Sequence, residues 1–284
     1  MNFSIAAFLG VLQGVTEFFP VSSSGHLMLA EHFLNLPVAD LKAFDVVLHA
    51  GTLLALIVLF WREWRGMVLG SWFAVLGSAG RNERTSLRLL GMLVVATIPA
   101  AVAGLLLNDW IDEFTRGEGR VYLVAGFFVL VAGLLAVAEI FRKDRTPSDP
   151  APGARQAVGE MVTWKQVAWM GIFQVTALLP GVSRSGATIA AGMFGGLTRS
   201  VAARFSFLML APVTLGAVIL ISQKVLAGGL TLPAGPLTLV GFTTSAIASY
   251  VCAAALLKFV KKHSLIVFSI YLSMAALALI SYMN

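Results

Sequence analysis

The most constraining feature of this 284-residue sequence is a segment that occurs twice. The first copy, Gly10–His26, reads GVLQGVTEFFPVSSSGH, and the second copy, Gly171–Ala187, reads GIFQVTALLPGVSRSGA. Each copy is an apolar stretch broken by proline and followed by a run of hydroxyl-bearing residues and glycine. The repetition predicts a chain built from two related halves.

The two copies differ at the positions where chemistry needs different groups. The first copy carries Glu17 and His26, where the second copy has alanine. The second copy carries Arg184, where the first copy has Ser23. An acid, a candidate base and a fixed cation are therefore divided between two similar loops.

The composition indicates an integral membrane protein. Hydrophobic residues make up 58% of the chain and charged residues only 12%, against roughly 25% charged residues in soluble domains. The net charge of +6 is spread over short loops, so we expect no nucleic-acid partner. The single Cys252 excludes an intrachain disulfide and a cysteine metal cluster.

Six stretches are long and apolar enough to cross a bilayer, which takes about 20 residues. They are Phe44–Trp61, Leu87–Leu107, Val121–Phe141, Val201–Ile221, Leu237–Leu257 and Leu265–Tyr282. The shorter Gly66–Gly80 suggests an interfacial helix, and the polar, proline-rich Arg142–Glu160 suggests a linker. Each copy of the repeated segment is predicted to be a re-entrant helix hairpin, because loop backbone at membrane depth must be buried in protein.

Counting these elements predicts an all-α membrane protein with two inverted-topology repeats. Each repeat is a re-entrant hairpin plus three transmembrane helices, and an odd number of spans makes the second repeat start on the opposite face. The repeats are residues 1–141 and 163–284, joined by a linker at 142–162, within a single membrane domain.

The basic residues give the orientation. Of the 20 Lys and Arg residues, fifteen fall on the side opposite the N-terminus and four fall on the N-terminal side, with Arg184 in the second loop. Cytoplasmic loops are enriched in Lys and Arg. We therefore expect both termini to lie outside.

Ionisable residues at membrane depth indicate function. Glu17 follows Gln13 by four residues and shares its helical face, so the pair is predicted to bind a cation or position a water. The alternative is a structural hydrogen-bonded pair. His26 follows Ser23 by three residues and is predicted to face the same way, as a catalytic residue.

Arg184 in the second loop needs an anionic partner, and its planar guanidinium suits phosphate. Ser183, Ser185 and the backbone amides after them are predicted to form an anion site at a helix N-terminus. The alternative is a buried ion pair between Arg184 and Glu17. Asp45 and His49 share a helical face, and we expect them to act as an auxiliary polar brace.

These segments resemble the signature sequences of a known family. EFFPVSSSGHL and LLPGVSRSGATI, together with FDVVLHAGTLLA, are similar to segments of undecaprenyl-diphosphate phosphatases of the bacitracin-resistance type. The resemblance covers the whole chain. It implies hydrolysis of undecaprenyl diphosphate, a prenyl diphosphate lipid, to undecaprenyl phosphate and phosphate, which recycles the lipid carrier of peptidoglycan synthesis.

The resemblance also implies a site and a location. It implies a divalent cation, Mg²⁺ or Ca²⁺, and an active site open to the outer face of the bacterial cytoplasmic membrane. Gln13 replaces the first acid of some relatives, which argues against a two-carboxylate metal site. The implied functional residues are the acidic pair Gln13 and Glu17, the loop residues Ser22, Ser23 and His26, and the phosphate-binding residues Ser183, Arg184 and Thr188.

We expect Ser23 to be the nucleophile, with His26 as its base or as the acid to the leaving group. A water activated by Glu17 and His26 is an alternative that the sequence does not separate from it. A lipid or solute transporter is the rival function, because inverted repeats with broken helices suit alternating access. The sequence leaves the choice between monomer and homodimer open.

Overall fold

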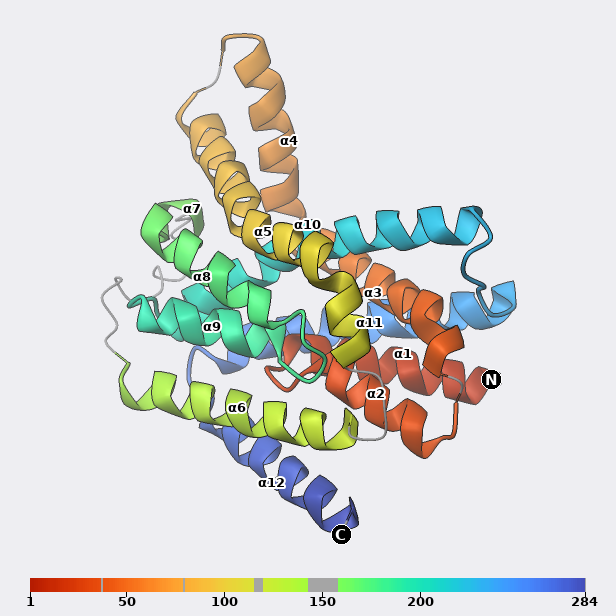
Figure 1. Ribbon diagram of the computed structural model, residues 1–284. Coiled ribbons are helices and arrows are strands. Elements are labelled where there is room, and N and C mark those ends of the chain that lie inside the picture. The colour runs from red at the N-terminus through yellow and green to blue at the C-terminus, as the bar shows by residue number, and fades with distance from the viewer. Residues whose placement is uncertain (37, 79, 115–119, 143–157, 284) are drawn as a thin grey trace.

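The computed structural model describes residues 1–36, 38–78, 80–114, 120–142 and 158–283. Within these residues the regular structure is entirely helical (Figure 1). The first half contains α1 (Phe3–Phe18), α2 (Ser23–Phe33), α3 (Val38–Leu59), α4 (Trp61–Val75), α5 (Arg81–Phe114) and α6 (Arg120–Ile140). The second half contains α7 (Val158–Met161), α8 (Trp164–Thr176), α9 (Arg184–Phe194), α10 (Arg199–Leu226), α11 (Gly235–Phe259) and α12 (Ile266–Met283).

Both copies of the repeated segment form a helix, a short connection and a second helix, as predicted. The first hairpin is α1–α2, and the second is α8–α9. Serines start the second helix of each: Ser22 accepts a hydrogen bond from the Gly25 amide, and Ser183 accepts one from the Gly186 amide. Such caps satisfy amides that lack a partner in the first helical turn.

Among the described residues, five helices are long and apolar enough to span a membrane, which confirms the membrane class. They are Leu41–Leu59, Arg81–Leu107, Val121–Ile140, Arg199–Leu226 and Gly235–Phe259. The sixth predicted span corresponds to the apolar helix Ile266–Tyr282, which falls in a shorter class of 10–17 residues together with α1.

One predicted helix boundary was wrong, and one predicted linker contains a short helix. The helix expected at Gly66–Gly80 runs instead from Trp61 to Val75, because Gly77 adopts a φ of +71° and ends it. The predicted linker contains the short helix α7, whose Val158 is buried against the rest of the protein. The remainder of that linker, residues 143–157, lies outside the described residues.

Each half packs the first helix of its hairpin against a helix of the other half. Helix α1 of the first half lies along α11 of the second, and α8 of the second half lies along α5 of the first (Figure 1). Helices α3 and α10 contact each other, as do α6 and α12. The contact between α1 and α11 is so close that a Cβ on Gly14 would lie 2.6 Å from the Ser249 amide nitrogen.

A polar contact ties three helices together at one end of α6. The Glu139 carboxylate accepts hydrogen bonds from Nε and Nη2 of Arg199, at 2.8 and 2.6 Å, and from the amide of Leu265 at 2.7 Å. Arg199 begins α10, and Leu265 precedes α12. The arrangement holds the start of α10 and the residue before α12 against α6. Most residues of α9 and of the first half of α10 are buried.

Candidate active site

A cavity of about 230 Å³ lies where the two hairpin loops meet. Its polar lining comes from both copies of the repeated segment. The first copy contributes Thr16, Glu17, Ser23 and Ser24, the second contributes Ser183, Arg184 and Ser185, and α3 adds His49. Residues of both loops therefore line one cavity.

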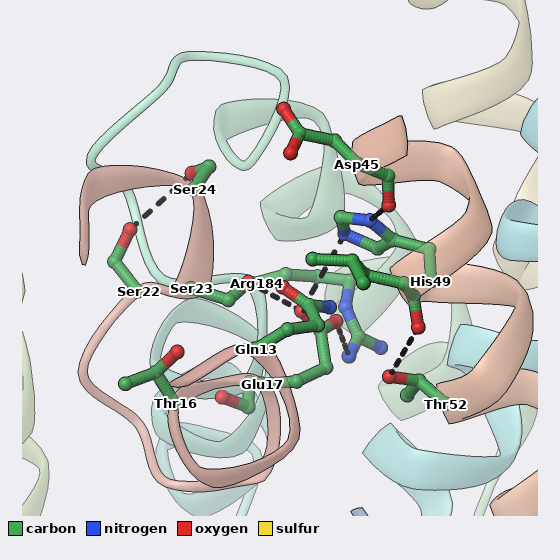
Figure 2. Close-up of polar contacts among 12 residues, drawn as sticks. Gln13, Thr16, Glu17, Ser22, Ser23, Ser24, Asp45, His49, Thr52 and Arg184 are labelled. Atoms are coloured by element: carbon green, nitrogen blue, oxygen red, sulfur yellow. Dashed lines mark hydrogen bonds and ion pairs between the residues drawn. The ribbon is translucent and has the colours of Figure 1, made fainter. Parts of the chain in front are cut away.

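Glu17 is the centre of the polar network (Figure 2). Its Oε2 accepts hydrogen bonds from the Ser23 hydroxyl and from Nε2 of Gln13, the latter at 3.1 Å. Nε2 of His49 lies 3.7 Å from the same oxygen. A carboxylate with these partners is held in one orientation, and the Ser23 proton points directly at it.

Arg184 forms the buried ion pair with Glu17 that was expected as the alternative to an anion site. Its Nη2 lies 3.0 Å from Oε1 of Glu17, and its Nη1 donates to the backbone carbonyl of Ser206 at 3.3 Å. Its Nε is buried and has no hydrogen-bond partner within the described residues. A buried guanidinium N–H without a partner is costly, so the ion pair does not use all of the binding capacity of Arg184.

The two loops also touch through hydrogen bonds and close backbone approach. The Gly181 amide donates to the Ser24 hydroxyl at 3.3 Å, and the Ser185 hydroxyl donates to the Phe19 carbonyl at 3.3 Å. A Cβ on Gly25 would lie 3.2 Å from Cα of Gly181 and 2.7 Å from the Phe128 ring. The glycine following the serines is therefore needed for the loops to meet.

The predicted phosphate-binding residues fall into two groups. Ser183 and Ser185 line the cavity and lie 3.2 Å apart through their hydroxyl oxygens. Thr188 does not line it: its hydroxyl donates to the Arg184 carbonyl at 2.8 Å and lies 2.6 Å from the Ser206 hydroxyl. Ser22 is the buried cap of α2 and has a φ of +74°, a conformation that costs energy for a residue other than glycine.

The positions of His26 and His49 relative to the cavity are the reverse of those expected. His26 does not line the cavity; its Nδ1 lies 2.7 Å from the Ser22 carbonyl, and its Nε2 lies 2.7 Å from the Tyr271 hydroxyl of α12. His49, expected to be an auxiliary residue, lines the cavity. Its Nδ1 lies 2.8 Å from the Asp45 carbonyl, and because a carbonyl only accepts, Nδ1 carries a proton and Nε2 faces Glu17.

Asp45 takes no direct part in the cluster around Glu17. Its backbone carbonyl orients His49, whereas its carboxyl group points away from Glu17 (Figure 2). Asp45 therefore contacts this cluster through its backbone, at His49.

The donor atoms beside Glu17 suit a hard divalent cation. Oε1 of Gln13 is buried and lacks a hydrogen-bond donor among the residues that the structure describes. Amide and carboxylate oxygens are preferred ligands of Mg²⁺ and Ca²⁺, and Mg²⁺ commonly completes its shell with substrate phosphate and water. In the described ranges no group of three or more His, Cys, Asp or Glu side chains gathers.

Several site residues were not identified from the sequence. Thr16, Ser24, Ser206 and Thr214 line the cavity or contact Arg184. Thr16 and Ser24 lie inside the repeated segment, so its extent was a usable signal. Ser206 and Thr214 lie on α10 within an ordinary apolar span, and nothing in their spacing marks them.

Comparison with known proteins identifies the family of this chain. The family model described as bacitracin resistance protein BacA matches residues 6–278. A protein of Gemmatimonas aurantiaca named undecaprenyl-diphosphatase is 41% identical over 267 residues, which cover 94% of this chain and 92% of the relative. Proteins of the same name from Geobacter sulfurreducens and Pelobacter propionicus are each 39% identical, over 100% and 99% of this chain and 99% and 97% of the relatives. The chain belongs to the bacitracin resistance protein BacA family.

Proposed function

We propose that this protein hydrolyses undecaprenyl diphosphate to undecaprenyl phosphate and inorganic phosphate, recycling the lipid carrier of peptidoglycan synthesis. The relatives described above are named for this activity, and they match nearly the whole chain. A transporter finds no support from them.

The observation that carries this proposal is the placement of Arg184. Arg184 lines the cavity, and its buried Nε has no hydrogen-bond partner among the residues that the structure describes; Ser183 and Ser185 lie beside it at the start of α9. A helix N-terminus and a guanidinium group both favour a bound phosphate. We therefore assign the terminal phosphate of the substrate to this end of the cavity.

Ser23 is the nucleophile in this proposal, and Glu17 accepts its proton. The Ser23 hydroxyl already donates to Oε2 of Glu17. Its oxygen forms a bond to the terminal phosphorus, the bond from that phosphorus to the bridging oxygen breaks, and undecaprenyl phosphate leaves. Arg184 and the α9 amides offset the charge on the transferred group, which is the main requirement of phosphoryl transfer.

Water completes the reaction. It attacks the phosphoserine, inorganic phosphate leaves, and the Ser23 oxygen regains a proton. His26 can act as the acid to the leaving group only if one of its ring nitrogens leaves its present partner, the Ser22 carbonyl or the Tyr271 hydroxyl. His49 lies nearer to Glu17, so it is a second candidate for proton transfer.

The proposed divalent cation would be held by Glu17 and by Oε1 of Gln13, which has no hydrogen-bond partner in the described part of the chain. When bound, it would neutralise part of the diphosphate charge. The residues of the chain would still provide the nucleophile, the proton acceptor and the guanidinium group.

We also propose two inverted repeats, 1–141 and 163–284, in the bacterial cytoplasmic membrane. Reciprocal packing supports this symmetry, because each half lends its first hairpin helix to a span of the other half. The uneven distribution of Lys and Arg supports an orientation with both termini outside. The cavity would then open to the outer face.

Phosphate release from undecaprenyl diphosphate by the purified protein in detergent tests the function. We expect turnover in the presence of Mg²⁺ or Ca²⁺, and a strong reduction in an Arg184→Lys variant that remains folded. No phosphate release under any metal condition would rule the activity out.

A further inference from the structure

His26 forms a hydrogen bond through each of its two ring nitrogens. Nδ1 lies 2.7 Å from the Ser22 carbonyl oxygen, and Nε2 lies 2.7 Å from the Tyr271 hydroxyl. Because a carbonyl oxygen only accepts, Nδ1 carries a proton, and Nε2 of the neutral ring then accepts the hydrogen bond from Tyr271. The two partners together select one tautomer of His26.

Packing holds the His26 ring in the same orientation. The Phe128 ring of α6 lies 5.1 Å from it between centroids, at an interplanar angle of 24°, and the Tyr271 ring of α12 lies 5.8 Å away at 13°. Helices α6 and α12 also pack against each other. Turning His26 away would break two hydrogen bonds and two ring contacts at once, so α6 and α12 fix the ring in place.

The carbonyl group that His26 contacts belongs to a strained residue. Ser22 has a φ of +74° and a ψ of 98°, a conformation that costs energy for a residue other than glycine and persists only where neighbouring groups hold it. Its carbonyl oxygen accepts hydrogen bonds from Nδ1 of His26 and from the His26 amide, the latter at 3.2 Å. These two hydrogen bonds hold the Ser22 carbonyl in its present direction.

The direction of this carbonyl group orients the residue that follows. The Ser22 carbonyl and the Ser23 amide lie in one planar peptide group, so rotation of that group would turn the Ser23 backbone as well. The Ser23 hydroxyl donates to Oε2 of Glu17 at the cavity. A chain of contacts therefore leads from Tyr271, which does not line the cavity, to the proposed nucleophile.

We propose that Tyr271 is a positioning residue for phosphoryl transfer and that it acts through His26. Its hydroxyl holds the imidazole ring, and the ring holds the peptide group that directs Ser23 toward Glu17. The proposal rests on the proposed function. It gives α12, from which no described residue lines the cavity, a part in the reaction. His26 keeps both of its present partners in this role, and the reaction depends on its Nδ1–H group rather than on a proton given to the substrate.

Tyr271→Phe is the direct test, because phenylalanine keeps the ring beside His26 and removes only the hydroxyl. Since Tyr271 does not line the cavity, we expect kcat on undecaprenyl diphosphate to fall on the order of tenfold while KM changes by less than about twofold. Tyr282→Phe is the matched control on the same helix. Tyr282 is exposed and packs edge-on against the Phe33 ring, so this variant should keep the kcat and KM of the wild type.

His26→Asn separates positioning from proton donation. Asparagine places an amide N–H near the position of Nδ1 and has no group at the position of Nε2, so it can still donate to the Ser22 carbonyl. We expect His26→Asn to retain a kcat on the order of tenfold above that of His26→Ala, whereas loss of a catalytic acid would leave both variants equally slow. In the His26→Asn protein, Tyr271→Phe should cause no further loss, because the hydroxyl has no ring nitrogen to hold.

Nitrogen-15 NMR of the histidine rings in detergent gives a readout that does not depend on turnover. The His26 signals are those that His26→Asn removes. In the wild type they should show a protonated Nδ1 and an unprotonated, hydrogen-bonded Nε2, and the Nε2 signal should shift in Tyr271→Phe but not in Tyr282→Phe. Should Tyr271→Phe yield too little folded protein, the wild-type spectrum and the comparison of His26→Asn with His26→Ala still decide the proposal.

The outcomes separate the two proposals. A wild-type protein that releases no phosphate would overturn the proposed function. An active wild type with an unchanged kcat in Tyr271→Phe, or with the same loss in Tyr282→Phe, would overturn the role of Tyr271 alone. Equal activity of His26→Asn and His26→Ala, an additive loss in the double variant, or an Nε2 signal that does not respond to Tyr271→Phe would also overturn it.

Discussion

Arg184 and Glu17 join the two copies of the repeated segment through an ion pair, with Nη2 of the arginine 3.0 Å from Oε1 of the glutamate. The side chains are 11% and 6% exposed. Each charge is thus the main counterion of the other in a poorly hydrated place, and removing either leaves a buried charge uncompensated. The site is defined by this contact, since neither loop contains both groups.

Arg184→Lys tests the geometry of the guanidinium group. Lysine keeps the positive charge but cannot donate in a planar fork, so we expect phosphate release to fall at least tenfold, about 1.4 kcal/mol in the barrier. Arg204→Lys, at the ion pair with Glu63 away from the cavity, is the control and should retain activity. Near-normal turnover in Arg184→Lys would contradict the proposed role of the Arg184 guanidinium group in phosphate binding.

Glu17→Gln tests the proton acceptor. The amide keeps the size of the side chain but loses its charge, so we expect turnover to fall on the order of 100-fold or more and its metal dependence to weaken. Melting temperature should fall as well, because Arg184 loses its counterion. Glu17→Asp restores the charge and should recover part of the stability; a Glu17→Gln protein with normal kinetics would contradict the proposal.

Ser23→Ala distinguishes the two routes that the sequence left open. If Ser23 is the nucleophile, phosphate release should nearly vanish, whereas a route through activated water should lose only about tenfold. Ser71→Ala, on α4 and outside the cavity, serves as the control. Trapping of radiolabelled phosphate on the wild-type protein but not on Ser23→Ala would give independent support for the covalent route.

Gly14→Ala tests the packing of α1 on α11. The added methyl group would lie 2.6 Å from both the Ala248 Cβ and the Ser249 amide nitrogen, and overpacking of this kind typically costs about 1–3 kcal/mol. We expect a lower melting temperature in detergent. Gly133→Ala on α6, where the added Cβ would meet no atom of another described helix within 4 Å, should be neutral, and equal melting temperatures for the two variants would refute the close contact.

A reporter fused after Asn284 tests the orientation. The charge distribution predicts that this terminus lies outside, so alkaline phosphatase fused there should be active and green fluorescent protein should not fluoresce. A fusion within the 142–162 linker should give the opposite pair of results. Cytoplasmic reporter activity at the C-terminus would reverse the proposed orientation.

The elements that the sequence predicted best are those with strong local signals. The two hairpins follow from repeated serine caps and prolines, and the spans follow from long apolar runs. Helix α4 was misplaced because the glycine that ends it, Gly77, was counted inside it. The burial of α7 depends on contacts with α5 and α10, which no local pattern records.

In the site, too, the sequence identified residues but not the contacts that they make. Glu17, Ser23 and Arg184 could be singled out because charged and hydroxyl groups are unusual at membrane depth. Their neighbours could not, since His26 turns to Tyr271 and His49 approaches Glu17 only through the packing of α2, α3 and α12. A histidine three residues from a serine shares its face, but the helix that lies opposite decides what it touches.

The packing of each half's first hairpin helix against the other half sets an order of events during synthesis. Helix α1 leaves the ribosome first, but α11, the span that it packs along, is made near the end of the chain. Glu17 likewise lacks its counterion until Arg184 of α9 has been made. During synthesis the α1–α2 hairpin, with the charged Glu17, therefore has to stay at the membrane before its packing partner α11 exists. The first half completes its fold only when the second half has been made.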